Sequence, residues 1–439
     1  MQGKVFFTKD IHHIHTSQVK SILLRLPNWL GDSVMVSPAF EWLKKSFETA
    51  QFTLVGTKAS CGIYERDKRV KAIFIDTTKA ASCRIIATKA LANKIGTHDI
   101  AISFSNTFFS ALLLYWSKSP LRIGYGKNAR NFLLSHPLTL HKYHQNRLKH
   151  QVLLYLELIT PLSQVQNYAI KTQNSADFIQ DFAYKNDKHK KDSINLSNHS
   201  HIKISHDEIL TYLATQPLHL ISSPITLPTK SYAIGINPGA AFGSAKCWEK
   251  SYFIDIIKHF LTQGYDVYLF GSSEQSRANV EIAQSFINHP QAQFFHNLTD
   301  KTSLTQLIDY IGAMNVFITN DSGPMHIAAA LNVPMIAIFG PTNIDETAPY
   351  SPAPLAQNHT LEIQSAANMR DTQDSISPHI IENPPQWVLL CKYVPCAPCK
   401  KRECPLTHHR CMTLITPQEV ITHTMNLLKN NDKRLNNDT

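Results

Sequence analysis

The pattern of apolar and polar positions divides this chain into two blocks, and a polar stretch separates them. Within each block, short apolar runs rich in β-branched residues predict buried strands, and apolar residues at helical spacing predict helices. Predicted strands in the first block are 20–26, 52–55, 72–75 and 99–103, with helices at 33–47 and from the last strand to 116. Those in the second are 232–237, 266–270, 316–319 and 335–339, with helices at 252–263 and 276–287. This alternation predicts parallel sheets, so we expect two doubly wound α/β domains.

The same pattern predicts the domain boundaries. We expect a polar extension at 1–18, an α/β domain at 19–160, a linker or insertion at 161–230, a second α/β domain at 231–415 and a terminal helix with a disordered tail at 416–439. The linker has too little apolar material for a core, although a short helix is predicted at 207–215. After Pro349 we expect irregular chain, which includes a cysteine-rich segment at 391–411, and then a helix at 417–429.

Composition narrows the class of protein. A hydrophobic content of 43% with 17% charged residues is typical of a globular protein, and a formal net charge of +10 favours an anionic partner. The lysines and arginines form no dense tract, so nucleic acid is not expected. The amino end lacks the features of a signal peptide, and polar residues interrupt the apolar region 100–116. We therefore expect a cytosolic protein and leave contact with a membrane surface open.

The stretch 316–343 carries the clearest candidate binding site. Pro324 suits the first turn of a helix, and Asn332 can end that helix in a left-handed turn. The preceding loop joins the carboxyl end of a strand to the amino end of a helix, where free amides favour an anion and Gly323 permits close approach. His326, in the first helical turn, could donate to a phosphate. An ordinary capped turn with a packed histidine is the alternative.

Two neighbouring turns add charged groups. Gly239 and Gly243 allow close backbone approach, and Lys246 supplies a positive charge that suits a diphosphate, although the pattern is not a Walker motif. Glu274 follows another strand and could accept hydrogen bonds from a ribose. A surface lysine and a glutamate that favours its helix amino end are the alternatives. Because ligands of parallel sheets bind at the carboxyl ends of strands, we expect these turns to converge on one crevice.

In the first block, Asp32 lies where a helix begins. It could take a proton from a hydroxyl as a general base, or it could simply cap the helix. The helix dipole would keep this carboxylate ionised and weakly basic.

Four segments in order, LPNWLGDSVMVSPA, NPGAAFGSAKCWE, LFGSSE and TNDSGPMHIAAALNVPMIAIFGPTN, resemble the ADP-heptose:lipopolysaccharide heptosyltransferases of glycosyltransferase family 9, closest to the heptosyltransferase II type. The resemblance covers residues 20–430 apart from the linker. It implies a GT-B fold, with two Rossmann-like domains that face each other across a cleft. It also implies inverting transfer of L-glycero-D-manno-heptose from ADP-heptose to the first heptose of the lipopolysaccharide inner core, heptosyl-Kdo-lipid A. The expected location is the cytoplasm of a Gram-negative bacterium, with peripheral contact to the anionic inner-membrane surface.

The resemblance also implies roles for individual residues. Asp32 matches the general base, and Lys246 matches the lysine that holds the diphosphate and stabilises the leaving ADP. The implied donor-binding residues are Gly239, Lys246, Glu274, Thr302, Asp321, Ser322, Gly323, Pro324 and His326. Ala240 and Ala241 replace hydroxyl residues of some relatives, so backbone amides are expected to bind the phosphates there. The motifs require no cofactor, and a need for Mg²⁺ is left open.

Two further features have alternatives. Arg122, Lys127 and Arg130 are predicted to contact the acidic sugars and phosphates of the acceptor, with a solvated basic loop as the alternative. The cysteine-rich segment invites a zinc interpretation, but its spacing is not that of paired zinc knuckles, so we expect thiols or a disulfide and predict no metal ligand.

Rival functions remain at this point. The nearest are a heptosyltransferase of type I or III and a transferase that uses another ADP-sugar. A nicotinamide-dependent oxidoreductase is disfavoured because no G-x-G-x-x-G follows the first strand. A further alternative is a non-catalytic interaction protein that binds zinc through the cysteines.

Overall fold

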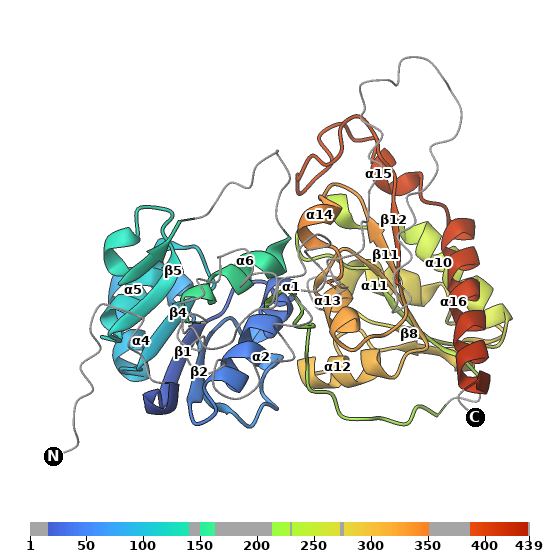
Figure 1. Ribbon diagram of the computed structural model, residues 1–439. Coiled ribbons are helices and arrows are strands. Elements are labelled where there is room, and N and C mark those ends of the chain that lie inside the picture. Colours follow the sequence, from blue (N-terminus) through green and yellow to red (C-terminus); the bar gives the residue numbers. More distant parts are fainter. Residues whose placement is uncertain are drawn as a thin grey trace, which may run out of the picture.

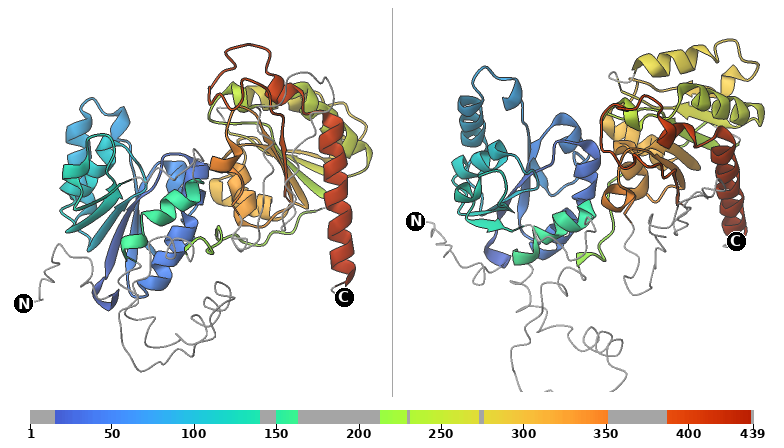
Figure 2. Two further views of the ribbon diagram at one scale, coloured as in Figure 1. Left: turned by 45° about the horizontal axis from the view of Figure 1, so that its top comes forward. Right: turned by 90° about the horizontal axis from the view of Figure 1, so that it is seen from above.

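The computed structural model describes residues 16–139, 150–162, 213–228, 231–272, 276–350 and 387–437. They form two α/β domains, each built on a six-stranded sheet (Figure 1). Figure 2 shows from two further directions that the domains lie side by side. The prediction of two doubly wound domains is confirmed.

The amino-terminal domain is built on a parallel sheet of order β3-β2-β1-β4-β5-β6. Its strands are β1 (Ser21–Arg25), β2 (Gln51–Gly56), β3 (Val70–Ile75), β4 (Ile100–Ser103), β5 (Leu121–Tyr125) and β6 (His136–Leu138). Its helices are α1 (Leu30–Met35), α2 (Ser37–Ser46), α3 (Lys58–Gly62), α4 (Arg84–Ile95), α5 (Phe108–Trp116) and α6 (Gln151–Glu157), with short 3-10 turns η2 (Thr16–Gln18), η3 (Thr78–Ala80) and η4 (Asn131–Leu133).

The single helix predicted at 33–47 is instead the pair α1 and α2. Pro38 lies at the start of α2 and has no amide to continue the hydrogen-bond series of α1. The break makes α1 a short helix whose first turn is free to face the other domain.

The carboxyl-terminal domain repeats the same topology, with the sheet order β12-β11-β10-β7-β8-β9. Its strands are β7 (Ala233–Asn237), β8 (Asp266–Leu269), β9 (Phe295–Asn297), β10 (Val316–Asn320), β11 (Met335–Phe339) and β12 (Trp387–Cys391). Its helices are α10 (Lys250–Thr262), α11 (Ser276–Gln284), α12 (Leu304–Gly312), α13 (Gly323–Ala330), α14 (Ile344–Thr347), α15 (Arg410–Thr413) and α16 (Pro417–Asn437), with 3-10 turns η5 (Ser244–Lys246) and η7 (Ala292–Phe294). In both sheets the first and fourth strands in chain order lie side by side at the centre, which is the switch point where such sheets bind ligands.

Two predictions about the end of the chain are wrong. The region after Pro349 is not irregular throughout, because five buried apolar residues form β12 and pair with β11. Helix α16 continues to Asn437 rather than ending at Lys429. Residues 430–437 contain no glycine or proline, and each added residue gains one backbone hydrogen bond. Val420 and Leu428 of α16 are buried in the core, so this helix belongs to the carboxyl-terminal domain.

Part of the predicted linker connects the two domains through specific contacts. Leu213, Leu218 and Leu220 are buried. In the same segment, the amide of His219 donates to Ser37 Oγ (2.9 Å) in the amino-terminal domain. The amide of Ser223 donates to Asp309 Oδ1 (2.7 Å) in α12. The expectations for residues 1–15 and 163–212, and most of the helix predicted at 207–215, lie outside the described residues.

The described helices include none that is both long and apolar enough to cross a bilayer.

Candidate active site

Helix α13 begins as the sequence predicts, and its amino end is open. Pro324 lies in its first turn, and Asn332 follows the helix with a φ of 59°. Ser322 is the N-cap residue, but no side chain caps the helix. The Ser322 hydroxyl instead contacts the Asn237 side chain (3.2 Å) and Thr319 Oγ1 (3.1 Å). The capped-turn alternative is therefore wrong, and the first amides of α13 keep their capacity to bind an anion.

Lys246 reaches the start of α13 from the turn after β7. Its Nζ lies 2.6 Å from Asp321 Oδ2, and the Thr342 hydroxyl donates to the same oxygen at 2.5 Å. The two side chains of the ion pair are 12% and 5% exposed. Lys246 is thus no ordinary surface lysine. The structure brings it together with Asp321, Ser322 and Gly323, as the sequence predicts.

Buried amide side chains fix the turn that carries Lys246. The Asn320 side chain donates to the Pro238 carbonyl (2.5 Å) and accepts from the Trp248 amide (3.2 Å). The Asn237 side chain donates to the carbonyl of Gly239, which is itself buried (3.1 Å). These bonds tie the turn after β7 to the end of β10, so both turns form one wall.

The cysteine-rich segment braces the same turn from outside. The Arg402 carbonyl accepts from the Ala245 amide (2.9 Å), and a side chain at Gly243, whose φ is +156°, would lie 2.3 Å from that carbonyl oxygen. A ring nitrogen of His409 lies 2.9 Å from the Ala245 carbonyl. All eight cysteines are described as thiols, and the described residues contain no grouped His, Cys, Asp or Glu side chains that could hold a metal ion.

Asp32 lies in the first turn of α1 but does not cap it. The N-cap residue is Trp29, and no side chain caps this helix. Asp32 Oδ1 instead accepts a hydrogen bond from the Tyr155 hydroxyl (3.2 Å). Burial raises the pKa of Asp32, the Tyr155 hydrogen bond and the Lys246 charge oppose this rise, and Asp321 adds to it. The capping alternative is wrong, and the expectation of a weakly basic carboxylate is contradicted by a pKa that burial raises above its ordinary value.

The amino ends of α1 and α13 meet between the domains (Figure 1). A Cβ on Gly31 would lie 2.7 Å from His326 Cδ2, and one on Gly323 would lie 2.8 Å from Leu30 Cδ2, so this approach needs glycine at both positions. Two positive helix ends thereby converge near Asp32, and together they favour an anion.

His326 is buried at this junction. Burial lowers its pKa to about 4; the Asp321 charge opposes this, and His150 and Lys246 add to it. The ring is therefore neutral near pH 7, and its Nδ1 has no hydrogen-bond partner among the described residues. This buried nitrogen is a polar atom left without a partner, and a ligand group that reached the junction would satisfy it without meeting a charge.

The side of the site near β8 is described only in part. Glu274 lies outside the described residues, and Thr302 is half-buried in the loop before α12. Asn279 of α11 donates to the Phe270 carbonyl and to Thr299 Oγ1, both at 2.9 Å, and so holds the turn after β8 against the loop before α12. Sequence reasoning missed Asn279, since no local motif marks it.

Two of the three residues predicted to contact the acceptor bond to backbone carbonyls of their own domain. Arg122 lies at the amino end of β5, on the edge opposite the site, and donates to the Leu133 (2.9 Å) and Ser119 (2.6 Å) carbonyls. Arg130 is completely buried and donates to the Tyr125 (2.8 Å) and Ser105 (2.6 Å) carbonyls. Both guanidinium groups serve the fold of their own domain. Lys127 alone is exposed at the carboxyl edge of the sheet.

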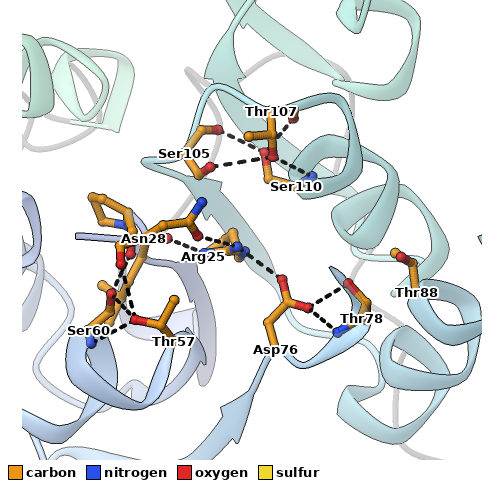
Figure 3. A network of polar contacts seen from close by, with 12 residues as sticks. Arg25, Asn28, Thr57, Ser60, Asp76, Thr78, Thr88, Ser105, Thr107 and Ser110 are labelled. Carbon is orange, nitrogen blue, oxygen red and sulfur yellow. Dashed lines mark hydrogen bonds and ion pairs between the residues drawn. The ribbon is translucent and has the colours of Figure 1, made fainter. Parts of the chain in front are cut away.

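A polar network at this carboxyl edge was not predicted (Figure 3). Arg25, at the end of β1, donates to Asn28 Oδ1 (2.9 Å) and Asp76 Oδ2 (3.0 Å), and Asp76 also accepts from the Thr78 hydroxyl (2.6 Å). Burial lowers the pKa of Arg25. For Asp76, burial opposes ionisation, but Thr78 and Arg25 lower its pKa overall. The sequence feature that could have predicted this network is Arg25, a charged residue at the end of an otherwise apolar strand.

Comparison with known proteins agrees with this geometry. The family model described as glycosyltransferase family 9 (heptosyltransferase) matches residues 88–376. Lipooligosaccharide heptosyltransferase 2 of Campylobacter jejuni serotype O:2 is 31% identical over 411 residues, which cover 93% of this chain and 98% of the relative. Lipopolysaccharide heptosyltransferase 2 of Escherichia coli K12 is 40% identical over 126 residues, 29% of this chain and 36% of the relative.

Two solved structures share the fold. The ADP-heptose LPS heptosyltransferase II of E. coli gives a TM-score of 0.62 at 23% identity, over 94% of this chain and 99% of that one. A glycosyl transferase of family 9 from Veillonella parvula gives 0.62 at 18%, over 94% and 98%. The GT-B arrangement expected from the sequence is thereby confirmed.

Proposed function

The chain belongs to glycosyltransferase family 9, the heptosyltransferases, and we propose that this glycosyltransferase moves L-glycero-D-manno-heptose from ADP-heptose to the first heptose of the lipopolysaccharide inner core. One observation carries the proposal. Asp32 of one domain lies at the meeting of two open helix ends, within the electrostatic reach of Lys246 and Asp321 of the other domain. A relative aligned over nearly its full length, named lipooligosaccharide heptosyltransferase 2, supports the choice of type.

The carboxyl-terminal domain binds the donor in this proposal. The diphosphate lies at the amino end of α13, where the free amides and the helix dipole favour negative charge. Lys246 turns from Asp321 to the diphosphate and stabilises the charge that builds on the departing ADP. His326 donates to a phosphate oxygen as a neutral ring. Gly239 and Pro324 shape the same wall, and Thr302 and Glu274 bind the adenosine end.

The amino-terminal domain supplies the proton chemistry. Asp32 takes the proton of an acceptor hydroxyl while the acceptor oxygen attacks the anomeric carbon of the heptose. The bond from that carbon to the diphosphate oxygen breaks on the opposite face, so the configuration inverts and ADP leaves with the electron pair. Tyr155 fixes the orientation of the Asp32 carboxylate through its hydrogen bond.

Acceptor recognition falls to the carboxyl edge of the amino-terminal sheet. Lys127 and the half-exposed indole of Trp29 lie on this edge, and the network around Arg25 lies beneath it. We expect the acceptor at the cytoplasmic face of the inner membrane, where the enzyme touches the anionic surface peripherally.

The direct test is a transfer assay. The purified chain is incubated with ADP-heptose and a lipopolysaccharide acceptor that ends at the first heptose, and the product is analysed by mass spectrometry. The expected result is a mass gain of one heptose. A gain only on a heptose-free acceptor would assign type I activity instead, and no gain on either acceptor would contradict the proposal.

A further inference from the structure

The positive charge of this chain is concentrated in one region. Residues 77–156 contain eleven lysines and arginines but a single acidic residue, Asp99. This excess of ten equals the formal net charge of the whole chain, so the remaining residues are balanced. The basic residues form no dense tract, and only the absence of carboxylates between them makes the region strongly positive. Eight of these basic residues and Asp99 lie in the described residues 77–139, so this part of the amino-terminal domain attracts an anionic partner.

An exposed apolar strip lies on that region. It consists of Ile85, Ile86, Phe108 and Phe132, of which Phe132 is 73% and Ile86 69% exposed, and the half-buried Phe109 lies next to Phe108 and packs against the core. Helix α4, which carries the isoleucines, packs against α5, and the Arg84 guanidinium next to Ile85 stacks over the Phe109 ring at 3.9 Å. The ring centroids of Phe108 and Phe109 are 6.0 Å apart, and those of Phe108 and Phe132 6.4 Å apart. Contiguous exposed apolar side chains of this kind mark interaction sites, whereas single ones do not.

The strip lies on the same edge of the sheet as Asp32. Its residues belong to the start of α4, the start of α5 and η4, which follow β3, β4 and β5 respectively. All three strands run parallel to β1, so these segments lie at the carboxyl edge from which α1 begins. Figures 1 and 2 show α4 and α5 on the side of this domain away from the carboxyl-terminal domain. The strip is therefore outside the domain interface.

Exposed basic side chains accompany the strip. Lys79 lies in η3, which packs against α4, and Lys89 lies one helical turn beyond Ile85 on α4. The carboxylate nearest in sequence, Asp76, is paired with Arg25 and bonded to Thr78, and the described residues of 77–98 and 100–139 contain no other. Aromatic and aliphatic side chains flanked by lysine are the combination that binds anionic lipid surfaces, where apolar insertion and charge attraction act together.

We propose that the apolar strip, with Lys79 and Lys89, docks this enzyme on an anionic lipid bilayer. The phenylalanine and isoleucine side chains enter the headgroup region while the lysines contact the lipid phosphates. Only the role of this docking rests on the proposed function. That role is to present a lipid-anchored acceptor to Asp32 along the shared edge.

Sedimentation with vesicles tests the docking without any catalytic readout. The full chain is mixed with vesicles of phosphatidylcholine alone, or of phosphatidylcholine with phosphatidylglycerol. The native protein should bind the mixed vesicles and release them at high salt. The double variant Phe132→Ser, Ile86→Ser should bind about tenfold more weakly, because it removes two side chains of the strip. Lys79→Glu should weaken binding to the mixed vesicles only.

Ile287→Ser is the matched control, since Ile287 is 70% exposed in the carboxyl-terminal domain. It should bind vesicles as the native protein does. Equal binding of the double variant and the native protein, or no binding to anionic vesicles, would overturn the proposal.

A deacylated, water-soluble acceptor separates this proposal from the proposed function. The double variant should transfer heptose to that acceptor at the native rate. If the native protein transfers heptose but does not bind anionic vesicles, the docking is contradicted and the proposed activity stands. If it binds the vesicles but transfers no heptose, the docking stands and the proposed activity is contradicted.

Discussion

The two domains share one strand order, yet their carboxyl edges are equipped differently. In the carboxyl-terminal domain, α13 begins without a side-chain cap beside the Lys246–Asp321 pair. In the amino-terminal domain, α1 also begins without a side-chain cap but carries Asp32 in its first turn, and Arg25 and Arg130 bond to groups of their own domain. The first edge offers unused amides and a charge that can change partners, which suits a diphosphate. The second offers the carboxylate of Asp32, whose pKa burial raises, and the exposed Lys127, which suits proton transfer and contact with a polar acceptor.

Among the substitutions that test this difference between the two edges, the one at Asp32 should have the largest effect on the transfer rate. Asp32→Asn removes the general base and should lower the transfer rate by about three orders of magnitude. The steady-state rate at saturating donor and acceptor measures it. A variant that keeps more than a tenth of native activity would show that the proton leaves by another route.

A change at Lys246 should come next. Lys246→Ala should lower kcat by about a hundredfold and weaken ADP binding, since the positive charge acts on both the bound diphosphate and the leaving group. Stability should fall too, because Asp321 is left buried without its partner, and thermal unfolding monitors that loss. Lys250→Ala is the control, as Lys250 pairs with Glu281 at the surface. A loss of stability with unchanged kcat would make Lys246 structural.

The meeting of the two helix ends can be broken with one methyl group. Gly31→Ala would place a Cβ against His326 and force α1 away from α13, so kcat/KM should fall about tenfold. Gly312→Ala in α12 meets only Leu331 at an ordinary distance of 3.4 Å and should change kcat/KM little. If both variants behave alike, the close approach of the helices is not needed.

Tyr155→Phe should shift the pH dependence rather than abolish activity. The Tyr155 hydrogen bond holds the pKa of Asp32 down, so removing it raises that pKa further. Because the base must be ionised, the acid limb of the kcat/KM profile should move to higher pH, with near-native activity above it. A uniform loss at all pH values would mean that Tyr155 acts only through packing.

The smallest effects distinguish the basic residues of the acceptor half. Lys127→Ala should raise KM for the acceptor a few-fold, as expected for an exposed charged contact. Arg122→Ala should leave that KM unchanged, because Arg122 lies on the opposite edge. An equal rise in both would restore Arg122 as an acceptor contact.

The donor half could be predicted well because its signals are local. Pro324 and Asn332 mark the ends of α13 within ten residues, and the glycines around Lys246 mark a turn. The principle that strand ends converge then brings Lys246 to Asp321 across 75 residues.

The rest depends on contacts that a pattern does not encode. Tyr155 meets Asp32 across 123 residues and shows no motif of its own. A basic loop does not reveal whether a guanidinium group faces solvent or, like that of Arg130, is spent on backbone carbonyls. The short run Trp387–Cys391 becomes a strand only because β11 offers an edge for it.

Calorimetric titration of ADP-heptose into the Asp32→Asn variant tests the division between the domains most directly. The variant should bind the donor with native affinity while it transfers no heptose, because the donor is held by α13 and Lys246. Loss of donor binding in a folded Asp32→Asn protein would contradict that division.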